Sequence, residues 1–265
     1  MHEYELIAGG TEPSDATTSR VRSVAFEAPW DWLSAGWVDL WRHPGVSLTY
    51  GAAFSCIAVG LLIGLFQYGW QSMILALGGG FLILGPFVAV GLYDVSRRIE
   101  AEQPVSLSTA AAAASRAKGQ LSFMGAILFF AFFVWVQIAL LLFMLFIGTT
   151  GFPPPSEFIP TLLFTLQGLG LLVVGTTVGA AIASVIFVMT VVSVPMLLEQ
   201  EVDAVTAMAT SYAAVRANPQ AMALWAALIA GFIALGLATM LVGLVFAFPL
   251  IAHATWHAYR DIVVR

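Results

Sequence analysis

The sequence predicts an all-α, multi-pass membrane protein in which six transmembrane helices form three hairpins, each preceded by an amphipathic helix on the cytoplasmic side. Of the 265 residues, 60% are hydrophobic and only 9% are charged, whereas soluble globular domains carry about 25% charged residues. So few charges cannot cover a water-exposed surface, and several apolar stretches are long enough to cross a bilayer. The Lys and Arg residues also fall on one side of this arrangement.

The N-terminal residues 1–27 are polar and acidic, which predicts a disordered cytoplasmic tail because they cannot build a packed core. They lack the basic start and apolar centre of a cleavable signal peptide, so none is expected. The remaining residues, 28–265, are expected to form one transmembrane domain.

A spanning helix requires about 20 apolar residues, because ~30 Å of hydrocarbon is crossed at ~1.5 Å per residue. The stretch 161–198 is too long for one straight span. We interpret it as a short interfacial helix over about 160–167 followed by one span, since proline begins a helix without strain. The six predicted spans are 45–66, 73–95, 121–148, 168–198, 220–240 and 242–260.

In this topology all ten Lys and Arg residues lie on the same side of the membrane. Because positive charges are retained in cytoplasmic loops, the pattern predicts that both termini are cytoplasmic. Splitting 161–198 into two spans would place Arg216, Arg260 and Arg265 outside, so six spans are preferred.

Two segments of the chain align around a proline. Residues 80–86 and 243–249 each begin with glycine and end with proline, and an arginine follows eleven residues later in both. A looser third copy of this pattern, around Pro195, lies near the end of the fourth predicted span. Proline removes a helical hydrogen bond and clashes with the preceding turn, so the repeat predicts helix breaks at Pro86, Pro195 and Pro249.

Three amphipathic stretches, 30–41, 106–118 and 203–216, each lead into an odd-numbered span. The first contains four tryptophans, whose apolar ring and polar N–H favour the headgroup level. We therefore predict an interfacial anchor, with a docking face for a partner protein as the alternative. The predicted interface residues are Trp30, Trp32, Trp37, Trp41, Arg97, Arg98, Trp256 and Arg260.

Two glycine pairs at helical spacing, Gly60 with Gly64 and Gly175 with Gly179, permit close helix packing within the chain or between copies.

His253 is the clearest ionisable residue within a predicted span, and His257 follows one turn later on the same helix face. Hydrogen bonding to neighbouring helices is the leading interpretation. The alternative is a metal site at His253 and His257, or a haem site. A metal requires three or four ligands, and the one carboxylate in a predicted span, that of Asp94, lies at its inner end, so no cofactor is otherwise predicted.

Nucleotide-binding loops, zinc-protease motifs and nucleophile elbows are absent from the sequence. We therefore expect no enzymatic activity and no catalytic residue. The net charge of −5 gives no basic excess, so no nucleic-acid partner is expected either.

Three local motifs carry a family resemblance: Trp-x-x-Leu at 37–40 with His43-Pro44, Gly85-Pro86 with Ser96-Arg97-Arg98, and His253-Ala-Thr-Trp-His257-Ala-Tyr-Arg260-Asp261. With these motifs the chain from about residue 28 resembles a family of uncharacterised integral membrane proteins of the proteobacterial type. The resemblance implies a six-helix protein of the bacterial inner membrane. Some such proteins are labelled cytochrome c oxidase subunit I, but that oxidase family uses about twice as many helices and more histidine ligands than this chain has histidines.

The leading functional hypothesis is a non-enzymatic interaction, accessory or assembly scaffold, whose partners are the lipid bilayer and other membrane proteins or a respiratory complex. One alternative is a permease or channel for an apolar or neutral solute, which the hairpin repeat and the prolines suggest. A further alternative is a haem- or metal-binding accessory subunit of a respiratory complex.

Overall fold

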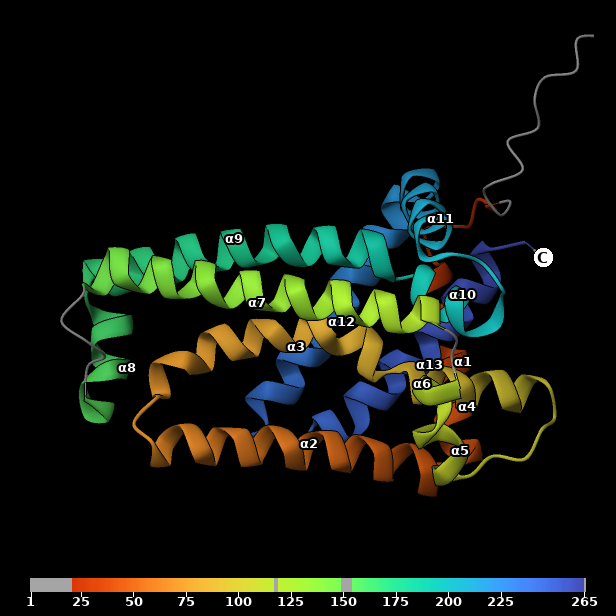
Figure 1. The fold of residues 1–265 in the computed structure, drawn as a ribbon, viewed down its shortest axis with the longest axis horizontal. Helices are drawn as coiled ribbons and strands as arrows, with labels where there is room; N and C mark the ends of the chain where they lie inside the picture. The colour runs from red at the N-terminus through yellow and green to blue at the C-terminus, as the bar shows by residue number, and fades with distance from the viewer. Residues whose placement is uncertain (1–20, 117–118, 149–153, 265) are drawn as a thin grey trace, which may run out of the picture.

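The computed structural model describes residues 21–116, 119–148 and 154–264, and it is all-helical (Figure 1). Across these residues the only bridge of β type is an isolated one between Val21 and Val263. Most of the predicted tail, residues 1–20, lies outside the described part. Its last residues are folded, because the Arg22 N–H donates to the carbonyl of Ile262 at 2.8 Å.

Four helical segments are long and apolar enough to cross a membrane. They confirm a membrane protein with several apolar helices, and three of them (α2, α7 and α9) run along the long axis of the molecule (Figure 1). The four segments are α2 (Pro44–Gln67), α7 (Gly119–Ile147), Leu166–Glu199, which comprises α9 (Leu166–Thr190) and α10 (Ser193–Glu199), and α12 (Pro219–Ala238).

The other two predicted spans, 73–95 and 242–260, are shorter or more polar helices. The first is divided into α3 (Ile74–Val88) and α4 (Val90–Glu100), and the second is α13 (Leu244–Ile262). The 15 residues of α3 extend only about 22 Å at ~1.5 Å per residue. The number of six spanning helices therefore stays a prediction.

The three repeat prolines differ in their effect. α3 ends two residues after Pro86, and α9 ends at Thr190, so that Pro195 lies in the first turns of α10, where proline is tolerated. The predicted break at Pro249 is wrong, because α13 continues through it to Ile262. Because proline has no backbone N–H, Pro249 cannot donate to the carbonyl of Val245, four residues earlier. Helix α2 approaches this carbonyl closely at Gly51.

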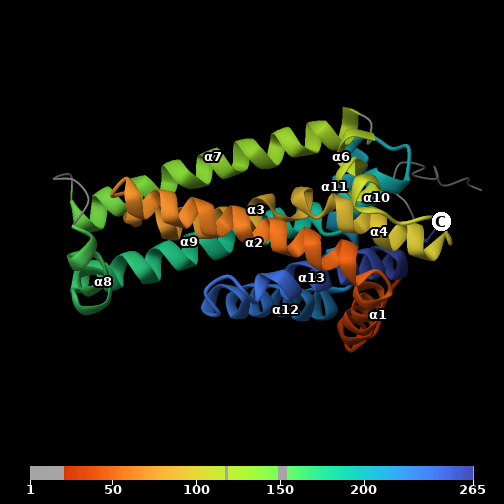
Figure 2. The ribbon, with the colours of Figure 1, turned by 90° about the horizontal axis from the view of Figure 1, so that it is seen from below.

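Short helices lie at the two ends of the molecule (Figures 1 and 2). One end, here called the platform end, also holds α4, α10 and the C-terminal residues. The short helices of the platform end are α1 (Ala28–Arg42), α5 (Leu107–Ala111), α6 (Ala113–Arg116) and α11 (Ala204–Ala217). The opposite end holds α8 (Pro155–Phe164).

The link between α8 and α9 is Thr165. Its hydroxyl donates to the Thr161 carbonyl at 2.6 Å and accepts from the Gly168 N–H at 3.0 Å, which caps α9. A helix before the fourth apolar segment, predicted over 160–167, is present as α8, but it runs from Pro155 to Phe164, and proline at its first position favours that start. Its place at the membrane interface stays a prediction.

The main core lies around α13, most of whose residues are buried between α1, α2, α4 and α12. Its largest fully buried side chains include Trp225, Trp256 and Tyr259. The α12–α13 hairpin does not reach the α8 end of the molecule (Figure 2). α13 is therefore enclosed at the platform end, where α1 covers it.

Candidate functional site

Helix α1 lies against the second half of α13, and a glycine allows the two backbones to meet. A Cβ atom at Gly36 would lie 2.6 Å from the backbone nitrogen of Ala254, which is closer than any side chain tolerates. Only glycine fits this crossing. One face of α1 is therefore held on the core, including Trp32, Leu33, Asp39 and Leu40.

A buried polar network joins α1, α2, α4 and α13 beneath this crossing. Nε2 of His257 lies 2.8 Å from Oδ2 of Asp39, and Asp39 is only 4% exposed. Ser96 on α4 is close enough to Asp39 to affect its carboxyl group. His253, which is fully buried, contacts the Ser96 hydroxyl through Nδ1 at 2.8 Å and the Ser47 hydroxyl through Nε2 at 3.0 Å.

The two ring nitrogens of His253 take opposite roles. In a neutral imidazole one nitrogen donates and the other accepts, so one of the two serine hydroxyls donates to the ring and the other accepts from it. Both nitrogens of this buried ring are therefore paired within the fold, without a further ligand.

The electrostatics of Asp39 follow from this arrangement. Burial alone would raise the pKa of the Asp39 carboxyl, but the hydrogen bond with His257 and the nearby Ser96 hydroxyl, together with the electrostatic effect of His257 and His253, hold the pKa below its usual value. Asp39 is therefore an ionised, buried carboxylate that ties the surface helix to the core.

A second contact holds the other end of α1. The indole N–H of Trp32 donates to Oδ2 of Asp261 at 3.1 Å, and Asp261 also pairs with Arg22 at 3.6 Å. The Trp32 ring lies edge-on to the ring of Trp225, with centroids 5.7 Å apart. The predicted role of Trp32 as an interfacial anchor is wrong, because its side chain is buried in the core.

The opposite face of α1, here called the tryptophan face, consists of Trp30, Trp37 and Trp41. These three side chains are 48–55% exposed, and the rings of Trp37 and Trp41 meet edge-to-face with centroids 5.6 Å apart. The two contacts at Asp39 and Asp261 thus hold a rigid aromatic surface outward.

The other predicted interface residues are paired within the fold. Arg97 and Arg98 both pair with Asp94 of their own helix, α4, whereas Arg260 on α13 pairs with Glu100 and Glu199 of other helices. Trp256 is fully buried, with its N–H 3.2 Å from Oε2 of Glu100. Its predicted place at the membrane interface is therefore wrong, because the end of α4 covers it.

Of the predicted packing glycines, only one is in a close contact. A methyl group placed on Gly179 would lie 3.0 Å from the ring of Trp135, whereas a methyl group on Gly60, Gly64 or Gly175 would meet no atom within 4 Å. Packing of these three against other copies of the chain stays a prediction.

Sequence reasoning missed Asp39, Ser47 and Ser96 as partners of the histidines. Of these three, only Asp39 could have been found from the sequence. Its helical spacing places it on the same face of α1 as Trp32 and Leu40, opposite the exposed tryptophans. Within the described ranges, no three His, Cys, Asp or Glu side chains gather as a metal site would require. A metal at His253 and His257 would have to replace the contacts to Ser47, Ser96 and Asp39.

Comparison with known proteins covers the middle of the chain. Residues 73–199, from α3 to α10, match the model of a family described as "Predicted integral membrane protein (DUF2189)". The protein is an integral membrane protein. Within the DUF2189 segment the network has only Ser96, so its hydrogen bond with His253 joins this segment to α13. No curated protein and no solved structure matches the chain.

Proposed function

We propose that the protein is a non-enzymatic scaffold of the bacterial inner membrane, whose helix α1 presents the tryptophan face to a partner membrane protein. The observation that carries the proposal is the double attachment of α1 through Asp39–His257 and Trp32–Asp261. An amphipathic helix that only floats at the interface has no need of a histidine–carboxylate contact and an indole–carboxylate bond to the core.

Fixing α1 lowers the entropic cost of binding, because the aromatic side chains are already ordered before the partner arrives. Tryptophan is also among the residues that contribute most to protein–protein affinity. The tryptophan face therefore combines exposure, rigidity and aromatic area on one side of one helix.

The distribution of charge supports cytoplasmic termini. The described arginines of α1, α4, α11 and α13 all belong to the platform end, whereas the described segments 68–70 and 154–164 at the α8 end contain no Lys or Arg (Figure 1). Because positive charges are retained on the cytoplasmic side, we place the platform end and α1 in the cytoplasm.

Co-purification of the full chain from native membranes in mild detergent, followed by mass spectrometry, tests the scaffold. We expect a stoichiometric membrane-protein companion that is lost from Trp37→Ala/Trp41→Ala. The matched control is Trp70→Ala, because Trp70 is 60% exposed at the α8 end. The absence of any stoichiometric companion, or its retention by the double variant, would overturn the proposal.

The same purified protein separates the alternative functions. A haem subunit would show a Soret absorbance band that disappears in His253→Ala. A permease would give solute uptake into vesicles that is lost when Pro86 or Pro249 is replaced. Neither result is expected from a scaffold.

A further inference from the structure

A cavity of about 320 Å³ lies between α3, α9, α12 and α13. Its wall is almost entirely hydrocarbon, and the larger apolar side chains that line it are Leu82, Ile186, Phe187, Ile229, Phe248 and Ile251. Its volume is at the lower end of the range for ligand sites in proteins. It is separate from the polar network and from the tryptophan face.

Three of the four hydroxyl groups in this wall are already used. Ser184, Thr190 and Thr255 each donate to the carbonyl four residues earlier in their own helix, at 2.7–2.8 Å. The fourth hydroxyl is that of Tyr93. The cavity therefore favours an occupant that needs no hydrogen bond, since apolar cavities exclude water and polar solutes.

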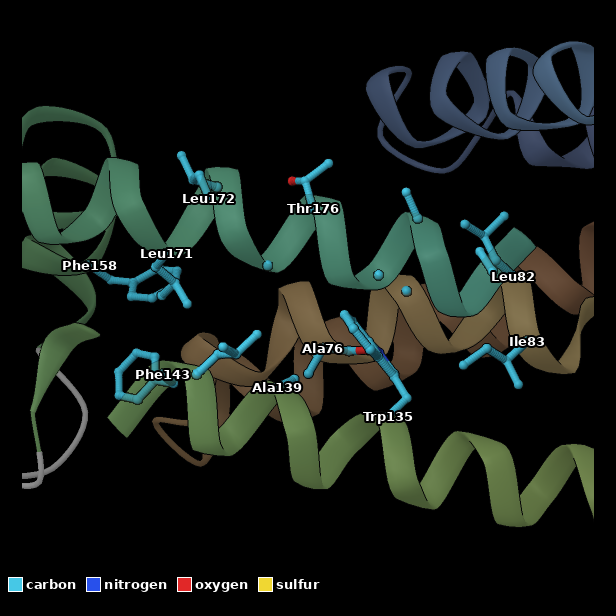
Figure 3. A pocket seen from close by; sticks show the side chains of 16 residues that line it. Ala76, Leu82, Ile83, Trp135, Ala139, Phe143, Phe158, Leu171, Leu172 and Thr176 are labelled. Atoms are coloured by element: carbon cyan, nitrogen blue, oxygen red, sulfur yellow. The ribbon is translucent and has the colours of Figure 1, made fainter. Parts of the chain in front are cut away.

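A second cavity of about 320 Å³ adjoins the first between α3, α7 and α9 (Figure 3). Leu82, Ala180 and Ala183 line both, so the two cavities lie in a row along α9, and they are here taken together as the joined space. Phe143, Phe158 and Leu171 line the second cavity toward α8 (Figure 3). Two cavities in a row suit a long, thin molecule better than a compact one.

The joined space also opens to the outside of the helix bundle. Ala180 and Ser184 line it and are nevertheless exposed. They belong to Leu166–Glu199, one of the four segments apolar enough to span a membrane. At that depth the surrounding medium consists of lipid acyl chains.

From these observations we infer that the two adjoining cavities bind the acyl chain of a bilayer phospholipid, which enters between the helices and lies along α9. This site does not depend on the scaffold proposal, because it uses none of the residues of α1. The small residues of α9 (Gly175, Gly179, Ala180 and Ala183) are then explained by the space they leave.

The test uses the full-length protein in nanodiscs that contain a phosphatidylcholine with a diazirine in the middle of one acyl chain. After photolysis, mass spectrometry locates the cross-links. We expect them to concentrate on the residues that line the two cavities, and to fall several-fold in Ala183→Phe, which fills the point shared by both.

The matched control is Val185→Phe, because Val185 is 58% exposed on the same helix and lines neither cavity. It should keep the wild-type pattern. If Ala183→Phe does not fold, Leu82→Trp replaces it, because Leu82 lies on α3 and lines both cavities. The same fall in cavity cross-links is expected. Cross-links spread evenly over the exposed helix faces, or cavity cross-links that persist in a folded blocking variant, would overturn the inference.

Discussion

The side chain of His257 crosses from α13 to α1 and contacts the buried carboxylate of Asp39, with Nε2 and Oδ2 2.8 Å apart. The two residues are 218 positions apart in the chain. This contact connects the last helix of the protein to its first and positions the tryptophan face.

Replacing Asp39 tests the importance of this contact for stability. In Asp39→Ala, the His257 side chain loses its partner at 2.8 Å, and a hydrogen bond to a charged group contributes about 1.5–3 kcal/mol. We expect a lower midpoint of thermal unfolding in detergent and faster proteolysis of α1. Asp31→Ala is the control, because Asp31 is exposed in the same helix. Equal midpoints for both variants would contradict the prediction.

The stability that Asp39 provides should depend on pH. A carboxyl whose pKa is lowered in the folded state stabilises the protein above the unfolded pKa, here near 3.8, and loses this contribution as the pH falls through the folded pKa. The wild type should therefore exceed Asp39→Asn in thermal midpoint near neutral pH, and the difference should shrink below about pH 4. Midpoints measured across this range check the trend, and a difference that grows on acidification would refute it.

The crossing of α1 and α13 should tolerate no side chain at Gly36. Gly36→Ala would place a methyl group against the backbone of Ala254, and overpacking of this kind costs about 1–3 kcal/mol. We expect a lower unfolding midpoint and weaker binding of the partner. Gly45→Ala, at a position with no atom within 4 Å of the new Cβ, should behave as the wild type in both assays.

A second pair of glycines tests the packing of α2 on α13. A methyl group at Gly51 would overlap the Val245 carbonyl oxygen, which Pro249 leaves free, so Gly51→Ala should destabilise the protein. The same substitution at Gly60 meets open space and should be neutral or stabilising by up to about 1 kcal/mol, because alanine favours the helix. Thermal unfolding in detergent checks the prediction, which is contradicted if the midpoint of Gly51→Ala is not below that of Gly60→Ala.

Local patterns predicted much of the secondary structure. The helices α1, α2, α7, α11 and α12 begin and end close to the predicted positions, because apolar length, amphipathic spacing and His-Pro or Asn-Pro boundaries are properties of adjacent residues. Helical spacing also predicts which tryptophans are buried, since Trp32 lies two residues from Trp30 and so faces the other side of α1. The prediction of one interfacial cluster of four tryptophans did not use this difference.

Composition and local spacing are enough to establish a helical membrane protein, with apolar segments that suit lipid and positive charges grouped outside them. Which polar residues meet depends on how the helices pack. Ser47 and His253 are 206 positions apart, and Ser96 and His253 are 157 apart, so no local pattern relates them. Their contact arises because α1, α2, α4 and α13 pack around one point, and a buried carboxylate must there find its donors within the fold.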